Sequence, residues 1–248
     1  MTRATSSVQR LHVTPDLQTD AIIEMDTKQA HYLRNVLRLE AGGELLLFNG
    51  RDGEWRAELE TVSKKLVLAR AVNQMRAQDA PSDIWLLVAP VKKERLDYLA
   101  QKATEMGAGK LLPVLTKRTQ GSRLNKDKLL ANTIEAAEQC NIMSLPEVGE
   151  PMRLDRLLAD WASLGEGRQI VFCDEAAACG TGARELDALK GKKLALLIGP
   201  EGGFDEAERA DLLARDDTLA LSLGPRILRT DTAVVAALAL VQSRLGDW

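Results

Sequence analysis

Two glycine-proline turns are the segments of this sequence best suited to bind a ligand. The first, Gly199-Pro200-Glu201-Gly202-Gly203, directly follows the apolar run LALLI, and the second, Gly224-Pro225-Arg226, directly follows the run LALSL. If both runs are strands, the turns lie at strand carboxyl ends, where open α/β sheets bind ligands. Glycine lets a ligand approach the backbone, and proline stiffens the turn. The alternative is that both segments simply connect a strand to a helix.

The residues in these turns restrict the class of ligand. A phosphate-binding Walker loop ends in Gly-Lys-Ser/Thr, and the dinucleotide fingerprint is G-x-G-x-x-G, whereas the spacing here is G-x-x-G-G. The carboxylate of Glu201 would also repel a pyrophosphate. S-adenosylmethionine has no phosphate and carries a positive sulfonium, so it fits these residues better. The sequence therefore favours a group-transfer site over a nucleotide-phosphate site.

Positive charge is concentrated in one part of the chain. The net charge of the protein is −3, yet residues 90–128 contain ten Lys or Arg and four Asp or Glu, a local net charge of +6. A basic region on an acidic protein is typical of a protein that binds a specific polyanion. The alternative is a set of solvated helix surfaces. Aromatic residues make up only 4% of the chain, so an RNA partner would be recognised by shape and backbone more than by base stacking.

The elements that must position these groups form two domains of different class. Residues 1–75 contain short apolar runs separated by turn signals, which predicts a small β-barrel. One helix, expected over Lys28–Leu39, places Arg34 and Arg38 four residues apart on a common face. After a polar linker, residues 81–248 alternate strands and helices, which predicts an α/β domain with a mostly parallel sheet covered on both faces.

Composition and cysteine count exclude several classes of protein. The apolar fraction of 45% and the charged fraction of 28% are typical of a globular chain. Three cysteines without a Cys-x-x-Cys pair argue against a disulfide scaffold and a zinc site, so we expect no metal. The first twenty residues lack the apolar segment of a secretory signal, and the longest apolar run, Ala233–Val241, is half a membrane span. We therefore expect a cytoplasmic protein that has no membrane partner.

Several segments resemble one enzyme family. IGPEGGF (Ile198–Phe204) and LGPRILRTDTA (Leu223–Ala233) are similar to signature segments of the knotted SPOUT methyltransferases, and more narrowly of the ribosomal small-subunit methyltransferase E family. HYLRNVLRL (His31–Leu39), QKATEMG (Gln101–Gly107) and EAAEQC (Glu135–Cys140) are similar to further motifs of that family, in the same order. The resemblance covers nearly the whole chain.

The resemblance implies a fold, a reaction and a set of site residues. The fold would be a PUA-like β-barrel followed by an α/β domain tied in a trefoil knot, and the protein would be a homodimer. The reaction would be methylation of N3 of one uridine in the decoding region of 16S rRNA, in the small ribosomal subunit, with S-adenosylmethionine as the donor. The donor-binding residues would be Gly199, Pro200, Glu201, Gly202, Leu223, Gly224, Ile227, Leu228 and Arg229, with Ile227 and Leu228 on either side of adenine. The RNA-binding residues would be Arg10, Arg34, Arg38, Lys92, Lys93 and Arg118.

The chemistry of uracil N3 indicates which groups could be catalytic. N3 is a weakly acidic imide, so the enzyme must favour its anion and align it with the methyl group; cationic side chains would stabilise that anion. Arg229 is the first candidate and Lys92 the second. Glu105 or Asp231 could accept the proton, as could bulk water. The alternative for Glu105 is a surface ion pair with Lys102 or Lys110, and for Asp231 an acid that offsets the dipole of the last helix.

The chain departs from the family pattern at Asn141-Ile142, where the family usually has Gly-Arg, and at Asp231, where it usually has Glu.

Two other functions remain open. The first rival is a non-enzymatic rRNA-binding assembly factor. The second is a SPOUT methyltransferase that acts on another RNA site. Donor binding separates the first rival from an enzyme, and mapping of the modified nucleotide separates the second.

Overall fold

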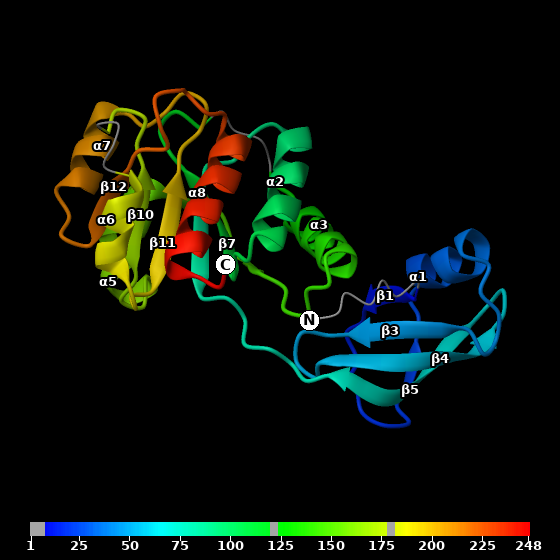
Figure 1. The fold of residues 1–248 in the computed structure, drawn as a ribbon. Helices are drawn as coiled ribbons and strands as arrows, with labels where there is room; N and C mark the ends of the chain where they lie inside the picture. The colour runs from blue at the N-terminus through cyan, green and yellow to red at the C-terminus, as the bar shows by residue number, and fades with distance from the viewer. Residues whose placement is uncertain (1–7, 120–123, 178–181) are drawn as a thin grey trace. The chain divides into compact units, whose positions relative to one another are not determined.

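The chain folds into two compact units (Figure 1). The computed structural model describes residues 8–119, 124–177 and 182–248. The first unit runs to Ala80 and also includes residues 137–144, and the second comprises Pro81–Ala136 and Leu145–Trp248. The expected domains, 1–75 and 81–248, were continuous segments. They did not include the return of residues 137–144 to the first unit.

The first unit is built on a five-stranded, mostly antiparallel sheet. Its strands are β1 (Gln9–His12), β2 (Ile22–Glu24), β3 (Glu44–Phe48), β4 (Glu54–Val62) and β5 (Val67–Arg76). The strand order is β1-β3-β4-β5-β2; among these described strands β1 pairs with β3 in parallel, and the other pairs are antiparallel. Register shifts between β4 and β5 bend the long hairpin. The bent sheet buries a core that includes Ile23, Leu45 and Leu47.

The helix expected over Lys28–Leu39 is shorter than predicted and changes type. An α-helix, α1, covers Thr27–His31 and begins with a capping box between Asp26 and Gln29. A π-helical turn, η1, follows over Tyr32–Val36, and the helix ends at Leu37. Arg38 lies beyond it with φ of 55°. The prediction that Arg34 and Arg38 share one α-helical face is therefore wrong, although both remain on the same short segment.

Arg10 is a buried structural residue of the first unit, which corrects its assignment as an RNA contact. Only 8% of the residue is exposed. Its Nε donates to Oε1 of Glu54 at 2.6 Å, and its two terminal nitrogens donate to the backbone oxygens of Ala137, Glu138 and Ile142 at 2.6, 3.1 and 3.1 Å. A guanidinium held in this way cannot also bind a phosphate. Its role is to fasten residues 137–142 to the sheet.

We expect acid to weaken the first unit through Glu54. Burial favours the neutral form of this carboxyl, but hydrogen bonds from Arg76 and Arg10 outweigh burial and hold its pKa below the ordinary value. A carboxyl whose pKa is lowered by folding stabilises the fold above its unfolded pKa, about 4.3 for glutamate, and this contribution is lost as the pH falls through the folded pKa. Hydrogen exchange of β4 peptides between pH 6 and 3 should therefore show progressive loss of protection. In Glu54→Gln this pH dependence should be weaker; an equal slope in both proteins would contradict the assignment.

The second unit contains a seven-stranded sheet whose described pairings are all parallel. Its strands are β6 (Ile84–Val88), β7 (Lys110–Leu115), β8 (Glu147–Val148), β9 (Met152–Arg153), β10 (Gln169–Cys173), β11 (Leu194–Ile198) and β12 (Thr218–Leu221). The order is β12-β10-β11-β6-β7-β8, and β9 pairs with β7. The five strands expected from the apolar runs of residues 81–248 are β6, β7, β10, β11 and β12, so this part of the prediction is confirmed.

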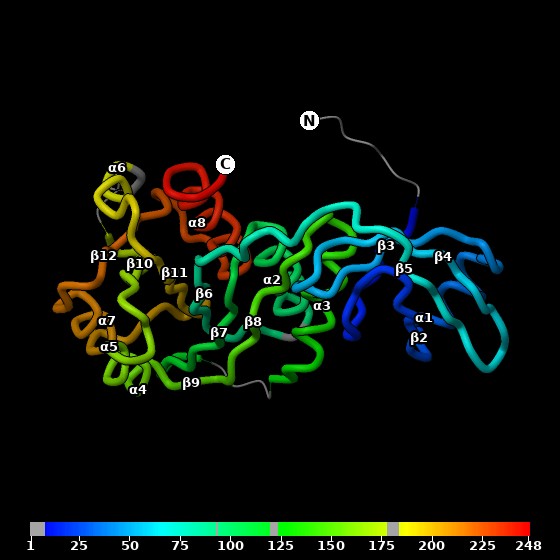
Figure 2. Tube along the Cα trace, turned by 90° about the horizontal axis from the view of Figure 1, so that it is seen from below, coloured from blue at the N-terminus to red at the C-terminus, as the bar shows by residue number. Residues whose placement is uncertain are grey.

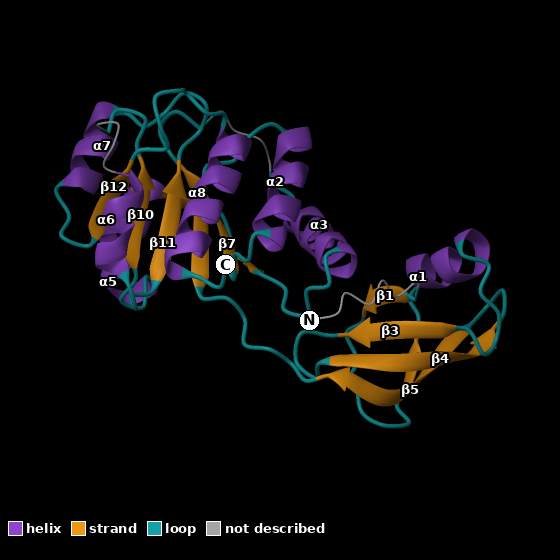
Figure 3. Ribbon diagram, in the orientation of Figure 1, coloured by secondary structure: helices purple, strands orange, loops and turns teal. Residues whose placement is uncertain are grey.

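Helices cover both faces of this sheet (Figures 2 and 3). The helices are α2 (Lys93–Glu105), α3 (Lys126–Gln139), α4 (Leu154–Ala159), α5 (Trp161–Leu164), α6 (Gly182–Leu186), the short η2 (Asp187–Leu189), α7 (Glu206–Leu213) and α8 (Thr230–Leu245). One apolar core joins the sheet to α2, α3, α6 and α8, and a second joins the other face to α4, α5 and α7. Strand side chains alternate between these cores: Leu86 belongs to the first and Leu87 to the second. Both faces are therefore apolar, as the continuous hydrophobic runs predict.

Candidate functional site

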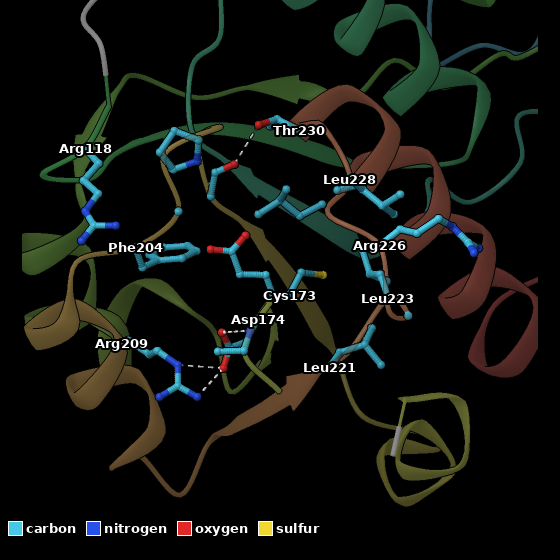
Figure 4. Close-up of a pocket in the computed structure, with 18 of the residues that line it drawn as sticks. Arg118, Cys173, Asp174, Phe204, Arg209, Leu221, Leu223, Arg226, Leu228 and Thr230 are labelled. Atoms are coloured by element: carbon cyan, nitrogen blue, oxygen red, sulfur yellow. Dashed lines mark hydrogen bonds and ion pairs between the residues drawn. The ribbon is translucent and has the colours of Figure 1, made fainter. Parts of the chain in front are cut away.

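A pocket lies over the carboxyl ends of three adjacent strands (Figure 4). Its floor includes Cys173, Ile198 and Leu221, which are the last residues of β10, β11 and β12. The parallel register pairs Cys173 with both of the others, so the three residues form one row across the sheet. The first glycine-proline turn begins directly after Ile198, and the second begins three residues after Leu221. The topology thus brings together two segments that lie more than twenty residues apart in sequence.

The two turns and their flanking residues form the walls of the pocket. Its volume is about 320 Å³, within the range usual for small-molecule sites. Figure 4 shows Leu223, Arg226 and Leu228 along one side and Phe204 and Arg118 along the other. Of the expected donor-binding residues, the pocket is lined by Gly199, Pro200, Leu223, Gly224 and Leu228. It is not lined by Glu201, Gly202, Ile227 or Arg229, which lie outside the cavity.

Gly199 is required by close packing within the first turn. A Cβ at this position would lie 2.5 Å from Cε2 of Phe204, closer than real side chains approach. The Phe204 ring is held in turn by an edge-to-face contact with Phe172, whose ring centroid is 4.9 Å away. The backbone oxygen of Gly199 accepts a hydrogen bond from Oγ1 of buried Thr230 at 3.0 Å. Thr230 is the first residue of α8, so this bond joins the first turn to the end of the second.

The charges around the pocket are balanced. Asp174 is 5% exposed, accepts a hydrogen bond from Nε of Arg209 at 2.9 Å, and forms an ion pair with Nη2 of the same residue at 2.8 Å. The remaining charged residues that line the pocket are Glu175, Glu206, Arg118 and Arg226, and all four are exposed. Such a rim suits a ligand that carries both an ammonium and a carboxylate better than one that carries several phosphates. The residues present therefore fit S-adenosylmethionine, whose methionine part is zwitterionic.

A second hollow adjoins the pocket on the other side of the first turn. It has a volume of about 270 Å³ and is lined by Pro90, Val91, Lys92, Arg95, Arg118, Pro200, Glu201 and Gly202. Arg118 and Pro200 line both hollows. Nη1 of Arg118 donates to the backbone oxygen of Gly202 at 2.9 Å, which fixes its guanidinium against the turn. Glu201 faces this second hollow and pairs with Arg95 at 3.1 Å, so its charge is directed away from the first pocket.

The candidate catalytic and RNA-binding residues are distributed over both units. Arg229 is exposed at the start of α8, directly after the second turn, and Lys92 is exposed before α2. Arg34 is partly exposed and donates to the backbone oxygen of Ser63 at 2.7 Å. Arg38 is exposed. The side chain of Lys93 lies outside the described part of the structure, so its expected contact stays a prediction.

The structure corrects the assignment of Glu105 as a candidate base. Helix α2 begins after the carboxyl end of β6 and ends before the start of β7. Glu105 is its last residue, about 18 Å along the axis from its first, at the opposite edge of the sheet from the pocket. Both carboxylate oxygens accept from Lys102 Nζ at 2.7 Å. Glu105 therefore forms the ion pair with Lys102 that was the alternative to a catalytic role.

Sequence reasoning missed several residues that line the pocket. Asp174 directly follows the apolar run QIVFC, just as Gly199 directly follows LALLI. The rule that ligands bind at strand carboxyl ends could therefore have identified Asp174 as a pocket residue. Arg209 could not be found from sequence, because only the packing of α7 brings it to Asp174. Cys173 is the last residue of the buried strand β10 and lines the pocket. Burial raises the pKa of its thiol to about 12, which favours the neutral thiol over the thiolate.

Two further findings concern metals and membranes. Within the described residues, no group of three or more His, Cys, Asp or Glu side chains is arranged to hold a metal ion. Among the helices of the same residues, none combines the length and the apolar character that crossing a bilayer requires.

An open parallel sheet with a small-molecule pocket between two glycine-rich turns at its carboxyl edge is the arrangement of a ligand-binding α/β enzyme. The chain belongs to the RNA methyltransferase family, whose domain it matches over residues 78–242. Residues 26–72 match the RNA methyltransferase PUA domain. The expected fold class, a PUA-like domain followed by an α/β SPOUT domain with a parallel sheet, is confirmed.

Relatives with assigned names agree with this family. The chain is 28% identical to ribosomal RNA small subunit methyltransferase E of Rickettsia conorii, with 94% of each chain covered. It is 30% identical to the Synechocystis protein of the same name, covering 95% of this chain and 78% of that one. Among solved structures, the Neisseria gonorrhoeae methyltransferase E bound to S-adenosyl methionine aligns with a TM-score of 0.81 and 25% identity, covering 97% and 99% of the two chains. A Legionella pneumophila protein with bound SAM aligns with a TM-score of 0.83 and 30% identity, covering 98% and 100%.

Proposed function

We propose that this protein transfers a methyl group from S-adenosylmethionine to N3 of a uridine in the decoding region of 16S rRNA. The observation that carries the proposal is the pocket over β10, β11 and β12, because its backbone turns and balanced rim suit this donor. The names of the relatives supply the RNA substrate, and the cationic hollow beside the pocket suits a polyanion. A non-enzymatic assembly factor would have no need for such a pocket.

The residues around the pocket have defined tasks in this reaction. When bound, S-adenosylmethionine supplies an electrophilic methyl group on a positive sulfonium. The exposed guanidinium of Arg229, on the segment that joins the second turn to α8, stabilises the anion formed when N3 loses its proton. Lys92, in the adjoining hollow, adds a second positive charge. Alignment of donor and base by the two rigid turns supplies the remainder of the rate enhancement.

The proposal includes a homodimer that acts in the cytoplasm on the small ribosomal subunit. Ile227 in the second turn is 84% exposed, an unusual position for a large apolar side chain beside a ligand pocket. A second copy of the chain or bound RNA would cover it and complete the binding site for adenine. Light scattering with and without donor measures the oligomeric state.

Donor binding and product mapping test the function together. Calorimetry should show stoichiometric binding of S-adenosylmethionine, and small subunits from a deletion strain should gain one N3-methyluridine when incubated with the protein and donor. Absence of donor binding would favour an assembly factor. Methylation of another RNA position would favour the second rival.

RNA binding should weaken steeply with salt. Each phosphate contact releases counterions, so the slope of log K against log salt concentration is about −0.7 to −0.9 per contact. Replacing Lys92 or Arg34 with alanine should make this slope less negative by about one unit each, measured by filter binding between 50 and 200 mM salt. Arg153→Ala, which removes an exposed arginine paired with Asp155, should keep the slope of the wild type. A slope near zero in the wild type would contradict the phosphate contacts.

A further inference from the structure

The hollow beside the donor pocket has the position expected of an acceptor site. Arg118 and Pro200 line both hollows, so a group bound in one lies next to a group bound in the other. Its volume of about 270 Å³ leaves room for a single pyrimidine base. A base in this hollow would have to leave its helix, as bases do in enzymes that act on their edges.

One acidic group faces this hollow among the described residues. Glu201 lines it together with Lys92, Arg95 and Arg118. Nη1 of Arg95 lies 3.1 Å from Oε1 of Glu201, and its Nε lies 4.0 Å from Oδ2 of Asp231. Asp231 and Glu94 line the next hollow along α2 and α8. Arg95 therefore stands between the carboxylates of Glu201 and Asp231, and its shorter contact is with Glu201, the one that faces this hollow.

The pairing of Arg95 with Glu201 affects how easily the target base can ionise. Methylation at N3 requires the base to carry negative charge, and an unpaired carboxylate nearby would make the anion harder to form. We propose that the hollow lined by Lys92, Arg95, Arg118 and Glu201 receives the target uracil, and that Arg95 is a positioning residue that neutralises Glu201 there. With Glu201 paired, the charges of Lys92 and Arg118 act on the base without opposition. This inference rests on the proposed function, because it concerns the acceptor of that reaction.

The experiment compares Arg95→Gln with the double variant Arg95→Gln/Glu201→Gln. In single-turnover methylation with saturating RNA and donor, Arg95→Gln should be about tenfold slower at neutral pH, with its rate–pH profile displaced about one unit upward, since one pKa unit is a tenfold change in the anion fraction. Removing the carboxylate in the double variant should recover most of the rate and return the profile. Donor affinity of Arg95→Gln should match the wild type, because Arg95 does not line the donor pocket. Lys126→Gln, which breaks an exposed pair with Glu150, serves as the matched control.

Three results would overturn the inference. A double variant as slow as Arg95→Gln would show that Arg95 acts by itself and not through Glu201. A higher KM for RNA, with the maximal rate and the pH profile unchanged, would make Arg95 an ordinary phosphate contact. A wild-type protein that transfers no methyl group to N3 would instead overturn the proposed function. An active wild type with an unaltered Arg95→Gln profile would overturn the inference alone.

Discussion

The Gly199→Ala variant is expected to bind S-adenosylmethionine roughly 5- to 150-fold more weakly than the wild type. The new Cβ would lie 2.5 Å from the Phe204 ring, and Phe172 blocks retreat of that ring. Overpacking of this kind costs about 1 to 3 kcal/mol. Because Phe204 lines the pocket, the strain falls on the wall that the donor contacts. Calorimetric titration of the purified variant with the donor measures the loss.

Gly202→Ala is the matched control, because it lies in the same turn. A Cβ there would meet only Arg118, at the ordinary contact distance of 3.6 Å, and Gly202 does not line the donor pocket. We expect its donor affinity to stay within about twofold of the wild type, since substitutions without a steric cause change free energies by at most about 0.5 kcal/mol. Equal weakening in both variants would mean that flexibility of the turn, and not the approach of Phe204, governs binding.

Arg10→Ala should destabilise the first unit by about 3 to 5 kcal/mol, the usual cost of removing one partner from a buried ion pair. The substitution leaves three backbone oxygens of residues 137–142 without the donor that holds them, and Glu54 keeps only Arg76 as an ionic partner among the described residues. Because the chain has two units, hydrogen exchange resolved by peptide is a better measure than one global transition. Loss of protection should appear in β1, β4 and residues 137–144.

Arg51→Ala provides the comparison for an exposed ion pair in the same unit. The side chain of Arg51 is 54% exposed, and that of its partner Asp16 is 90% exposed. Such pairs contribute about 0 to 1 kcal/mol, so exchange should change little. If Arg10→Ala were as mild as Arg51→Ala, the buried network would not be what holds residues 137–144.

The second unit was predictable to the extent that local pattern determines it. The run LALLI is continuously apolar, and QIVFC is apolar after Gln169, because strands β11 and β10 are buried on both faces; this composition indicates parallel strands. The position of the pocket then follows from the common edge at which parallel strands end. The ion pair between Arg209 and Asp174 depends on how α7 packs over the sheet, which no local pattern contains.

The misassigned residues show where pattern reasoning is insufficient. Arg10 was assigned to RNA binding from the family resemblance, and only the tertiary structure supplies its buried partner Glu54. Arg34 and Arg38 were assigned to one face because an α-helix was assumed, whereas the chain adopts a π-helical turn that ends before Arg38. Glu105 had a suitable side chain but lies at the wrong end of its helix.

The return of residues 137–144 to the first unit has a consequence for synthesis on the ribosome. The N-terminal sheet is complete in sequence at Arg76, yet the backbone oxygens that Arg10 binds belong to residues that are translated more than sixty positions later. Until those residues emerge from the exit tunnel, Arg10 in the nascent sheet lacks the three backbone oxygens that it binds in the complete fold. The first unit therefore begins to form early in synthesis but reaches its final stability only after residues 137–144 have been made. A chain cut at the linker would separate the N-terminal sheet from these residues.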